Sequence, residues 1–237
     1  GVVAQGKTMV RVAPDNAGAG EQASILLVGD SLTDQTHYVA RLHSHLSRPD
    51  NPLVTMIGNH AGGGKPPVPG GVAHEGYGGF TWSAFHTFYE TPDPNRLPYR
   101  KSYFLRKPHE LDIPQYLNQY NGGRTPDFIT FQLGVNDIFI QKDSNIEQAL
   151  VRIEKNMDIL IDAFREVAPD ATIGVGLCTL CAGQDAFGHD YQCGQTAWQY
   201  KKNVFRLNRL YLDKIQDRND PKLVIIPTVV NLDCENN

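Results

Sequence analysis

Apolar residues along the chain occur in two patterns: short continuous runs, and longer stretches in which they recur at helical spacing. The continuous runs are typical of buried parallel strands and cover residues 24–28, 53–57, 126–133, 171–177 and 223–230. The helical spacing covers residues 33–47, 146–167 and 196–215, and residues 81–90 more weakly. Because strands and helices alternate, the pattern predicts an α/β fold, a three-layer α/β/α sandwich around a central parallel sheet of five strands.

Two segments rich in glycine, proline or polar residues interrupt these patterns. Residues 1–23 include a turn-prone stretch at residues 15–20, and we interpret them as an extended N-terminal arm or linker. Residues 24–237 then form one domain, as a length of 237 residues favours. Residues 61–79 are expected to form a long surface loop, and such loops in compact domains are usually functional or disordered.

Composition argues against several classes of partner. The hydrophobic content of 41% is ordinary for a globular protein, and the net charge of -4 disfavours a nucleic-acid backbone. No apolar run approaches the roughly 20 residues that cross a bilayer, and the N-terminus lacks the pattern of a signal peptide. His43 and His45 lie two apart on a predicted helix and face different sides, which disfavours a metal pair. Neither nucleic acid, membrane, metal nor cofactor is therefore expected.

The sequence contains four cysteines, Cys178, Cys181, Cys193 and Cys234. An even number of cysteines suits two disulfide bonds in an exported protein, and Cys181 with Cys193 is the favoured pair. A thioredoxin-type motif at Cys178 and Cys181 would need a helix to follow, but Ala-Gly-Gln comes next. The cysteines thus predict an extracellular or periplasmic location.

Candidate chemistry appears where the first predicted strand ends. Ser31 stands at the turn between that strand and a helix, where backbone N–H groups and the helix dipole would stabilise a negatively charged oxygen. The alternative is that Ser31 or Thr33 only caps the helix. Ligands of open α/β sheets bind at the carboxyl ends of strands, which favours a role for Ser31 in a site.

Two further segments follow strands in the same way. Asn136, preceded by Gly134, comes after the third strand, and its amide could donate a hydrogen bond to a developing negative charge. The alternative is an Asx-turn that ends the strand. The glycine-rich segment around Gly79 could bring a backbone N–H to the same centre, or it could be only a flexible loop. Together the three segments predict a shared site.

These segments resemble the blocks of the SGNH, or GDSL, hydrolase family. Gly29-Asp30-Ser31-Leu32-Thr33 matches the first block, Gly79 the glycine of the second, and Gly134-Val135-Asn136-Asp137 the third. The resemblance covers roughly residues 24–230 and implies a flavodoxin-like sheet. It also implies that Ser31 is the nucleophile. The N–H groups of Ser31 and Gly79 and the side chain of Asn136 would then form the oxyanion hole, with Asp30 and Asp137 in supporting positions.

One block of the family is missing. Its Asp-x-x-His, which supplies the general base, does not occur after the fifth predicted strand; Asp34 to His37 has this spacing but follows the first block, and Asp185 to His189 is one residue too long and in another loop. Either the sequence omits a C-terminal segment, which we favour, or the base has been lost. The omission would leave one flank of the sheet uncovered. His74, His189 and the other histidines are interpreted as surface or loop residues, so the general base is unassigned.

The resemblance implies hydrolysis of carboxylic esters through an acyl-enzyme on Ser31. A small-molecule or polysaccharide ester is the expected substrate, with deacetylation of a carbohydrate ahead of a broad short-chain esterase. The alternative is a non-catalytic carbohydrate-binding domain that kept the fold. A further domain in the full-length protein is compatible with all of these.

Aromatic residues are concentrated after the second block. Most are expected in the core, and one or two could present a flat face to a sugar ring or an acyl chain. They are Tyr77, Phe80, Trp82, Phe85, Phe88, Tyr89, Tyr99, Tyr103 and Phe104.

Overall fold

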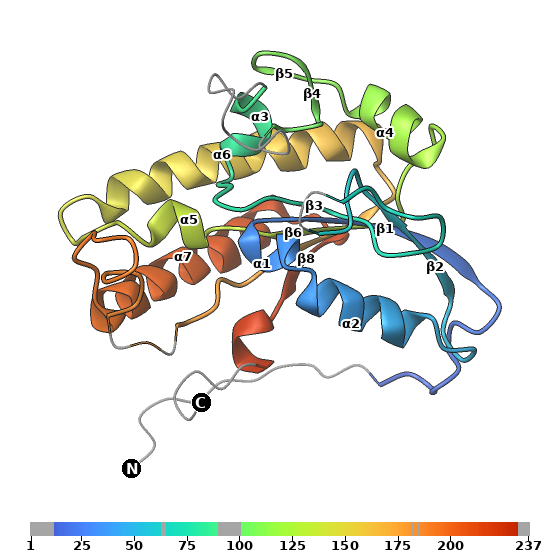
Figure 1. The fold of residues 1–237 in the computed structure, drawn as a ribbon, viewed down its shortest axis with the longest axis horizontal. Coiled ribbons are helices and arrows are strands. Elements are labelled where there is room, and N and C mark those ends of the chain that lie inside the picture. The colour runs from blue at the N-terminus through green and yellow to red at the C-terminus, as the bar shows by residue number, and fades with distance from the viewer. Residues whose placement is uncertain (1–11, 63–64, 90–100, 182, 184, 232–237) are drawn as a thin grey trace.

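The computed structural model describes residues 12–62, 65–89, 101–181, 183 and 185–231 (Figure 1). Its centre is a parallel sheet with the strand order β2-β1-β6-β7-β8. The strands are β1 (Gln22–Gly29), β2 (Leu53–Ile57), β6 (Phe128–Gln132), β7 (Thr172–Gly176) and β8 (Leu223–Ile226). The predicted five-stranded, flavodoxin-like sheet is therefore confirmed. Because the strand order reverses between β1 and β6, the carboxyl ends of these two strands form the switch point where such sheets bind ligands.

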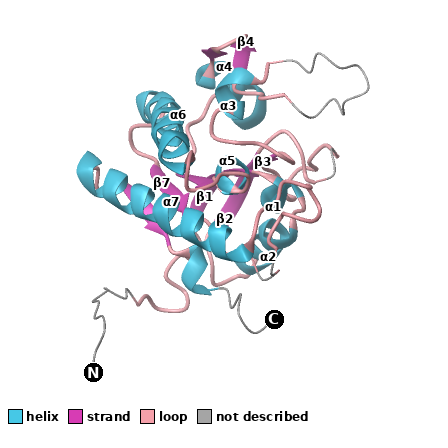
Figure 2. Cartoon of the chain, turned by 90° about the vertical axis from the view of Figure 1, so that its left-hand side faces the viewer, coloured by secondary structure: helices cyan, strands magenta, loops and turns pink. Residues whose placement is uncertain are grey.

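Helices pack on both faces of the sheet, as the three-layer prediction requires (Figure 2). In β1, Leu26 and Val28 face the larger core, which includes buried residues of α4 (Ile113–Asn121), α6 (Ile146–Val167) and α7 (Ala197–Arg218). Leu27, between them, faces a smaller core with Val39 of α2 (His37–Leu46). Side chains of a strand alternate between its two faces, so one short strand serves both cores.

The long amphipathic helices follow the sequence pattern closely. Helix α6 has the predicted bounds, and its apolar stripe, including Ile153, Met157 and Phe164, is buried. Helix α7 begins with Thr196 as its N-cap, whose side chain accepts a hydrogen bond from the N–H of Gln199. In the described part of the chain, no helix combines the length and the apolar character that crossing a membrane would require.

The predicted helix at residues 33–47 is wrong as a single element. It is divided into α1 (Ser31–Asp34) and α2, because Thr36 adopts the left-handed conformation with a φ of 67°. The Thr36 hydroxyl offsets part of the cost of this conformation by donating to the backbone oxygen of Asp34 at 3.0 Å. The short α1 therefore begins at Ser31 and ends at Asp34, two residues before the break.

The segment between α3 (Ala84–Thr87) and β6, to which the apolar pattern assigns no helix or strand, is partly structured. It holds a hairpin of β4 (Leu105–Lys107) and β5 (Glu110–Leu111), followed by α4. Helix α4 carries ordinary terminal signals, because the Asp112 carboxylate accepts from the N–H of Gln115 at 2.9 Å and Gly122 ends the helix with a φ of 59°.

The predicted surface loop at residues 61–79 is buried in its second half. There β3 (Glu75–Gly76) pairs in parallel with Val28 and Gly29 of β1, and residues 73–77 are all buried. The absence of a side chain at Gly76 allows this approach, since a Cβ there would lie 2.5 Å from the Cβ of Thr33. The loop therefore packs against the turn after β1.

One flank of the sheet is partly exposed among the described residues. On the face that carries α2, Phe128 of β6 is 44% exposed and Val224 of β8 is 38% exposed. Strand β8 ends at Ile226, earlier than predicted, and a 3₁₀ turn follows at Thr228–Asn231. Of the cysteines, Cys193 has a free thiol, so the expected bond between Cys181 and Cys193 is not formed, and Cys234 lies outside the described residues.

Candidate active site

The turn after β1 presents Ser31 without using its hydroxyl as a cap. Asp30 is the N-cap of α1: its carboxylate accepts from the N–H of Leu32 at 2.9 Å, and its backbone oxygen accepts from the N–H groups of Thr33 and Asp34. The hydroxyl of Thr33 is 2.8 Å from that of Tyr38. The alternative interpretation, in which Ser31 or Thr33 caps the helix, is therefore wrong.

Ser31 and Asn136 line the same pocket, which has a volume of about 240 Å³. Ser31 follows β1 and Asn136 lies in α5 (Val135–Ile138), which follows β6, so the pocket lies at the switch point of the sheet. The other residues that line the pocket are Leu32, Val135, Phe139, Thr179, Leu180, Cys181, Phe187, Tyr191 and Tyr200.

Asn136 is held by the loop that contains Gly79. Its Nδ2 donates to the backbone oxygen of Phe80 at 2.9 Å, and a carboxamide has a second N–H on the same nitrogen. The preceding Gly134 has a φ of 121°, and a Cβ there would lie 2.6 Å from the Tyr211 hydroxyl. The hydrogen bond to Phe80 thus holds the side chain of Asn136 at the pocket wall, and Gly134 leaves room for Tyr211 behind it.

Gly79 is not among the residues that line the pocket, but its neighbours contact both elements of the site. The N–H of Gly78 donates to the carboxylate of Asp34 in α1, and Phe80 accepts from Asn136. Gly79 itself is exposed and has a φ of 80°, a conformation that favours glycine. The structure therefore places Gly79 between the elements that carry Ser31 and Asn136.

The two supporting aspartates lie beneath the site. Burial raises the pKa of Asp30 to about 6 and the pKa of Asp137 to about 7. The Asp137 carboxylate accepts from the N–H of Trp82 at 3.4 Å, so it connects α5 to the segment after Gly79. Trp82 is itself anchored through its indole N–H, which donates to the Tyr211 hydroxyl at 2.7 Å.

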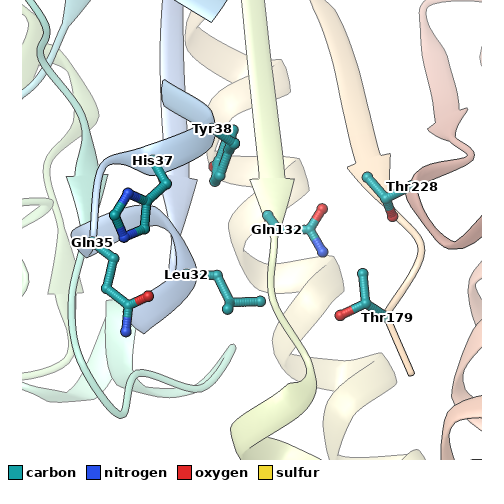
Figure 3. A pocket seen from close by; sticks show the side chains of 7 residues that line it. All are labelled: Leu32, Gln35, His37, Tyr38, Gln132, Thr179 and Thr228. Atoms are coloured by element: carbon teal, nitrogen blue, oxygen red, sulfur yellow. The ribbon is translucent and has the colours of Figure 1, made fainter. Parts of the chain in front are cut away.

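A second, larger pocket of about 440 Å³ adjoins the first and shares Leu32 and Thr179 with it (Figure 3). Figure 3 shows these side chains around the space beyond the ends of β6, β7 and β8. Its lining residues are Leu32, Gln35, His37, Tyr38, Gln132, Thr179 and Thr228.

Among the residues that the structure describes, no histidine lines the Ser31 pocket. His37 lines the adjoining pocket, and His189, which pairs with Asp190 at 3.1 Å, has a side chain that is 87% exposed. His74 and His60 are not surface residues, because His74 is fully buried and His60 is 2% exposed, although both lie outside the named strands and helices. The His60 ring packs against the rings of His74 and Tyr77, on either side of β3 in the sequence. The general base thus has no assignment in the structure.

Two parts of the site had no signal in the sequence. One is the aromatic wall, defined as Phe139, Phe187, Tyr191 and Tyr200, in which Phe139 lies 5.2 Å from Phe187 and 5.0 Å from Tyr191 between ring centroids. Of the aromatics after the second block, most were expected in the core. Tyr77, Phe80, Trp82, Phe85 and Phe104 are indeed buried, whereas Tyr99 lies outside the described residues.

The second part is a buried polar network beside the glycine-rich segment around Gly79, centred on Glu75. The fully buried carboxyl group of Glu75 accepts from the N–H of Asn59 at 2.6 Å, from the Tyr116 hydroxyl at 2.8 Å and from the Tyr77 hydroxyl. Burial raises the pKa of Glu75 to about 7.

No group of three or more His, Cys, Asp or Glu side chains in the described part of the chain is arranged to hold a metal ion.

Glu75→Gln is expected to remove a pH dependence of stability. Between the ordinary pKa of 4.5 and the folded value of about 7, the folded chain keeps a proton on Glu75 that the unfolded chain has released, so stability falls as pH rises. The shift corresponds to about 3 kcal/mol at roughly 1.4 kcal/mol per pKa unit. In urea unfolding between pH 4.5 and 8, the wild-type free energy of unfolding should fall by that amount relative to Glu75→Gln. A difference in free energy of unfolding between wild type and Glu75→Gln that stays constant over this pH range would contradict the prediction.

Comparisons with known proteins bear on the fold. No protein-family model matches this chain, and no curated protein matches it. A family 3 carbohydrate esterase from Clostridium thermocellum is similar in structure, with a TM-score of 0.52, 18% identity, and coverage of 87% of this chain and 78% of that one. An acetyl esterase mutant with acetate ion gives a TM-score of 0.51 and 16% identity over 86% of this chain and 78% of that one. The chain has the fold of the SGNH hydrolases.

A further structure with this fold, a putative platelet activating factor from Streptococcus pneumonia, has a TM-score of 0.50 and 14% identity, and covers 92% of this chain and 72% of that one. The predicted resemblance to SGNH hydrolases is confirmed for the fold. At identities of 14% to 18% the likeness extends to the architecture, and the roles of individual residues have to be argued from the pocket itself.

Proposed function

We propose that this protein hydrolyses carboxylic esters through an acyl-enzyme on Ser31, and that its substrate is an acetylated carbohydrate. The observation that carries the proposal is the pocket at the switch point, lined by both Ser31 and Asn136. Its residues come from the carboxyl ends of β1 and β6, and the oxygen of Phe80 holds the Asn136 amide in place. A nucleophile and a fixed donor in one small pocket are two of the parts that acyl transfer needs.

In the proposed reaction, Ser31 Oγ attacks the ester carbonyl carbon and gives its proton to the general base. The carbonyl oxygen takes up negative charge and is stabilised by the N–H groups of Ser31 and Gly79 and by the Asn136 amide. The C–O bond of the ester then breaks, and the alcohol leaves with the proton. Water then attacks the carbonyl carbon of the acyl-enzyme in the same way. The bond to Ser31 Oγ breaks, the acid is released and the Ser31 hydroxyl regains its proton.

The dimensions and lining of the pocket support an acetyl group and a flat alcohol. Its volume of about 240 Å³ accommodates an acetyl group beside Ser31. Tyr191, in the aromatic wall, is 63% exposed, so part of its ring is available at the pocket rim. Two structures with this fold are an acetyl esterase and a carbohydrate esterase, which supports the same choice. A polysaccharide substrate would in turn imply an extracellular or periplasmic location.

A second function is a carbohydrate-binding domain that kept the fold without catalysis. It is favoured by one observation: among the described residues, none of those that line the Ser31 pocket is a histidine. The two functions differ in whether the pocket turns over an ester, because both would retain sugars through the aromatic wall.

Tyr191→Ala tests the carbohydrate part of the proposal. Loss of the exposed ring should raise KM for an acetylated xylo-oligosaccharide about 3- to 10-fold, as removal of roughly 1 kcal/mol of stacking implies. KM for p-nitrophenyl acetate should change less than 2-fold, because the acetyl group stays beside Ser31. Trp198→Ala is the matched control, since Trp198 is 72% exposed on α7 and is not among the residues that line the pocket. Equal effects of Tyr191→Ala on both substrates would argue against a sugar at the wall.

A further inference from the structure

The glycine-rich loop, defined as residues 76–80, depends on contacts from outside for its shape. Gly76, Gly78 and Gly79 have no side chains to pack, and Gly79 has a φ of 80°. Glycines leave the backbone free to adopt many conformations, so a single path has to be selected by external partners. The loop is tied to β1 where the N–H of Tyr77 donates to the oxygen of Gly29 at 3.1 Å.

Asp34 binds the middle of this loop. Its carboxylate accepts from the N–H of Gly78, and its Oδ1 lies 3.3 Å from Nε2 of His60. Burial alone would raise the pKa of Asp34, but the hydrogen bond and charge of His60 and the N–H of Gly78 together lower it. The carboxylate is thus ionised at neutral pH, and charge-assisted hydrogen bonds of this kind are stronger than neutral ones.

His60 is held rigidly enough to orient Asp34. The backbones of His60 and His74 form an antiparallel bridge, with the N–H of His74 donating to the oxygen of His60 at 3.0 Å. The His60 ring lies 4.5 Å from the His74 ring and 4.8 Å from the Tyr77 ring between centroids. Its side chain is 2% exposed, and within the described residues Nδ1 has no hydrogen-bond partner. The Nε2 contact with Asp34 is therefore the polar contact that the ring makes.

His74 fixes the start of the loop. Burial, with His60 acting in the same direction, lowers the pKa of His74 to about 4, so the ring is neutral at physiological pH. Its Nδ1 accepts from the N–H of Gly76 at 3.1 Å, which places the ring proton on Nε2, 3.4 Å from the Thr36 hydroxyl. Side chains thus bind the N–H of Gly76 and the N–H of Gly78, the residues before Gly79.

We infer that Asp34, oriented by His60, is a positioning residue: it holds the Gly79 N–H at the position and orientation, relative to Ser31, that the oxyanion hole needs. Asp34 lies in the same short helix as Ser31, so its bond to Gly78 joins the nucleophile's element directly to the loop. The inference rests on the proposed function, since the position of the Gly79 N–H matters for catalysis only if Gly79 stabilises an oxyanion. A displacement of about 1 Å at a catalytic centre can reduce the rate about 10²-fold.

Asp34→Ala is expected to lower kcat about 10- to 100-fold with KM changed less than 3-fold, because the substrate binds before the oxyanion forms. The inhibition constant of methylboronic acid, which mimics the tetrahedral intermediate on serine, should rise by the same factor. Asp34→Asn keeps one acceptor oxygen and should show a smaller loss in both. Hydrogen exchange of the peptide containing residues 76–80 should accelerate in Asp34→Ala.

Asp112→Ala is the matched control, because it removes a carboxylate that accepts a backbone N–H at the start of α4, away from the pocket. It should leave kcat and the boronate constant unchanged. If the wild type hydrolyses esters and Asp34→Ala keeps its kcat, the inference is overturned while the proposed function stands. Faster exchange without a loss of kcat would likewise reduce Asp34 to a structural role and overturn it. A wild type without Ser31-dependent turnover would overturn the proposed function and the inference together.

Discussion

Ser31→Ala is expected to lower kcat/KM for p-nitrophenyl acetate by at least about 10⁴-fold, close to the background rate. The hydroxyl lost in this variant is the atom that would form the acyl-enzyme. The variant should fold normally, since Asp30 and not Ser31 caps α1. A fixed enzyme concentration, assayed with burst and steady-state kinetics, measures both acylation and turnover.

Ser47→Ala is the control for this substitution. Ser47 is an exposed serine at the end of α2, whose hydroxyl donates to the oxygen of His43 at 2.7 Å, and its loss should leave turnover unchanged. If wild type and Ser31→Ala hydrolyse the ester at the same background rate, the carbohydrate-binding alternative becomes the better account.

Asn136→Ala is expected to reduce kcat about 10²- to 10³-fold with little change in KM, which is the cost of removing one oxyanion donor. The side chain sits at the pocket wall with one N–H bonded to the oxygen of Phe80. Its second N–H is the one that a developing negative charge would use. Steady-state kinetics on a short-chain ester separate the two parameters.

A comparison with Asn136→Asp sharpens that test, because aspartate has a similar shape but no N–H to donate. Both variants should lose kcat to a similar extent. Asn156→Ala provides a control. Asn156 lies on α6, accepts a hydrogen bond from His86 and is not among the residues that line the pocket. A rise in KM with kcat unchanged would show that Asn136 binds the ground state and donates nothing to an oxyanion.

The fold could be predicted from the sequence where a single periodicity dominates. In α6 a continuous apolar stripe specifies both bounds and the buried face. The sequence also placed Ser31 and Asn136 at the ends of two strands, and parallel strands bring such ends to one edge. The break at Thr36 could not be found, because threonine seldom adopts a positive φ and the tertiary contacts that hold it come from residue 61.

The remaining parts of the site depend on contacts between segments far apart in the chain. Asp34 meets His60 across 26 residues, and the aromatic wall joins Phe139 to Phe187 from separate elements. Neither pair has a local spacing that periodicity could detect. Helix α4 was missed although Asp112, Pro114 and Gly122 mark its ends, since its nine residues are too short for the apolar period to be evident.

The most direct test of the shared pocket is a crystal structure of the protein after reaction with a methylphosphonate ester. Phosphorus is expected on Ser31 Oγ, with the phosphonyl oxygen about 3 Å from Asn136 Nδ2 and from the backbone nitrogen of Gly79. Phosphorus on another residue, or a phosphonyl oxygen that turns away from Asn136 into solvent, would show that Ser31 and Asn136 do not act on one ester.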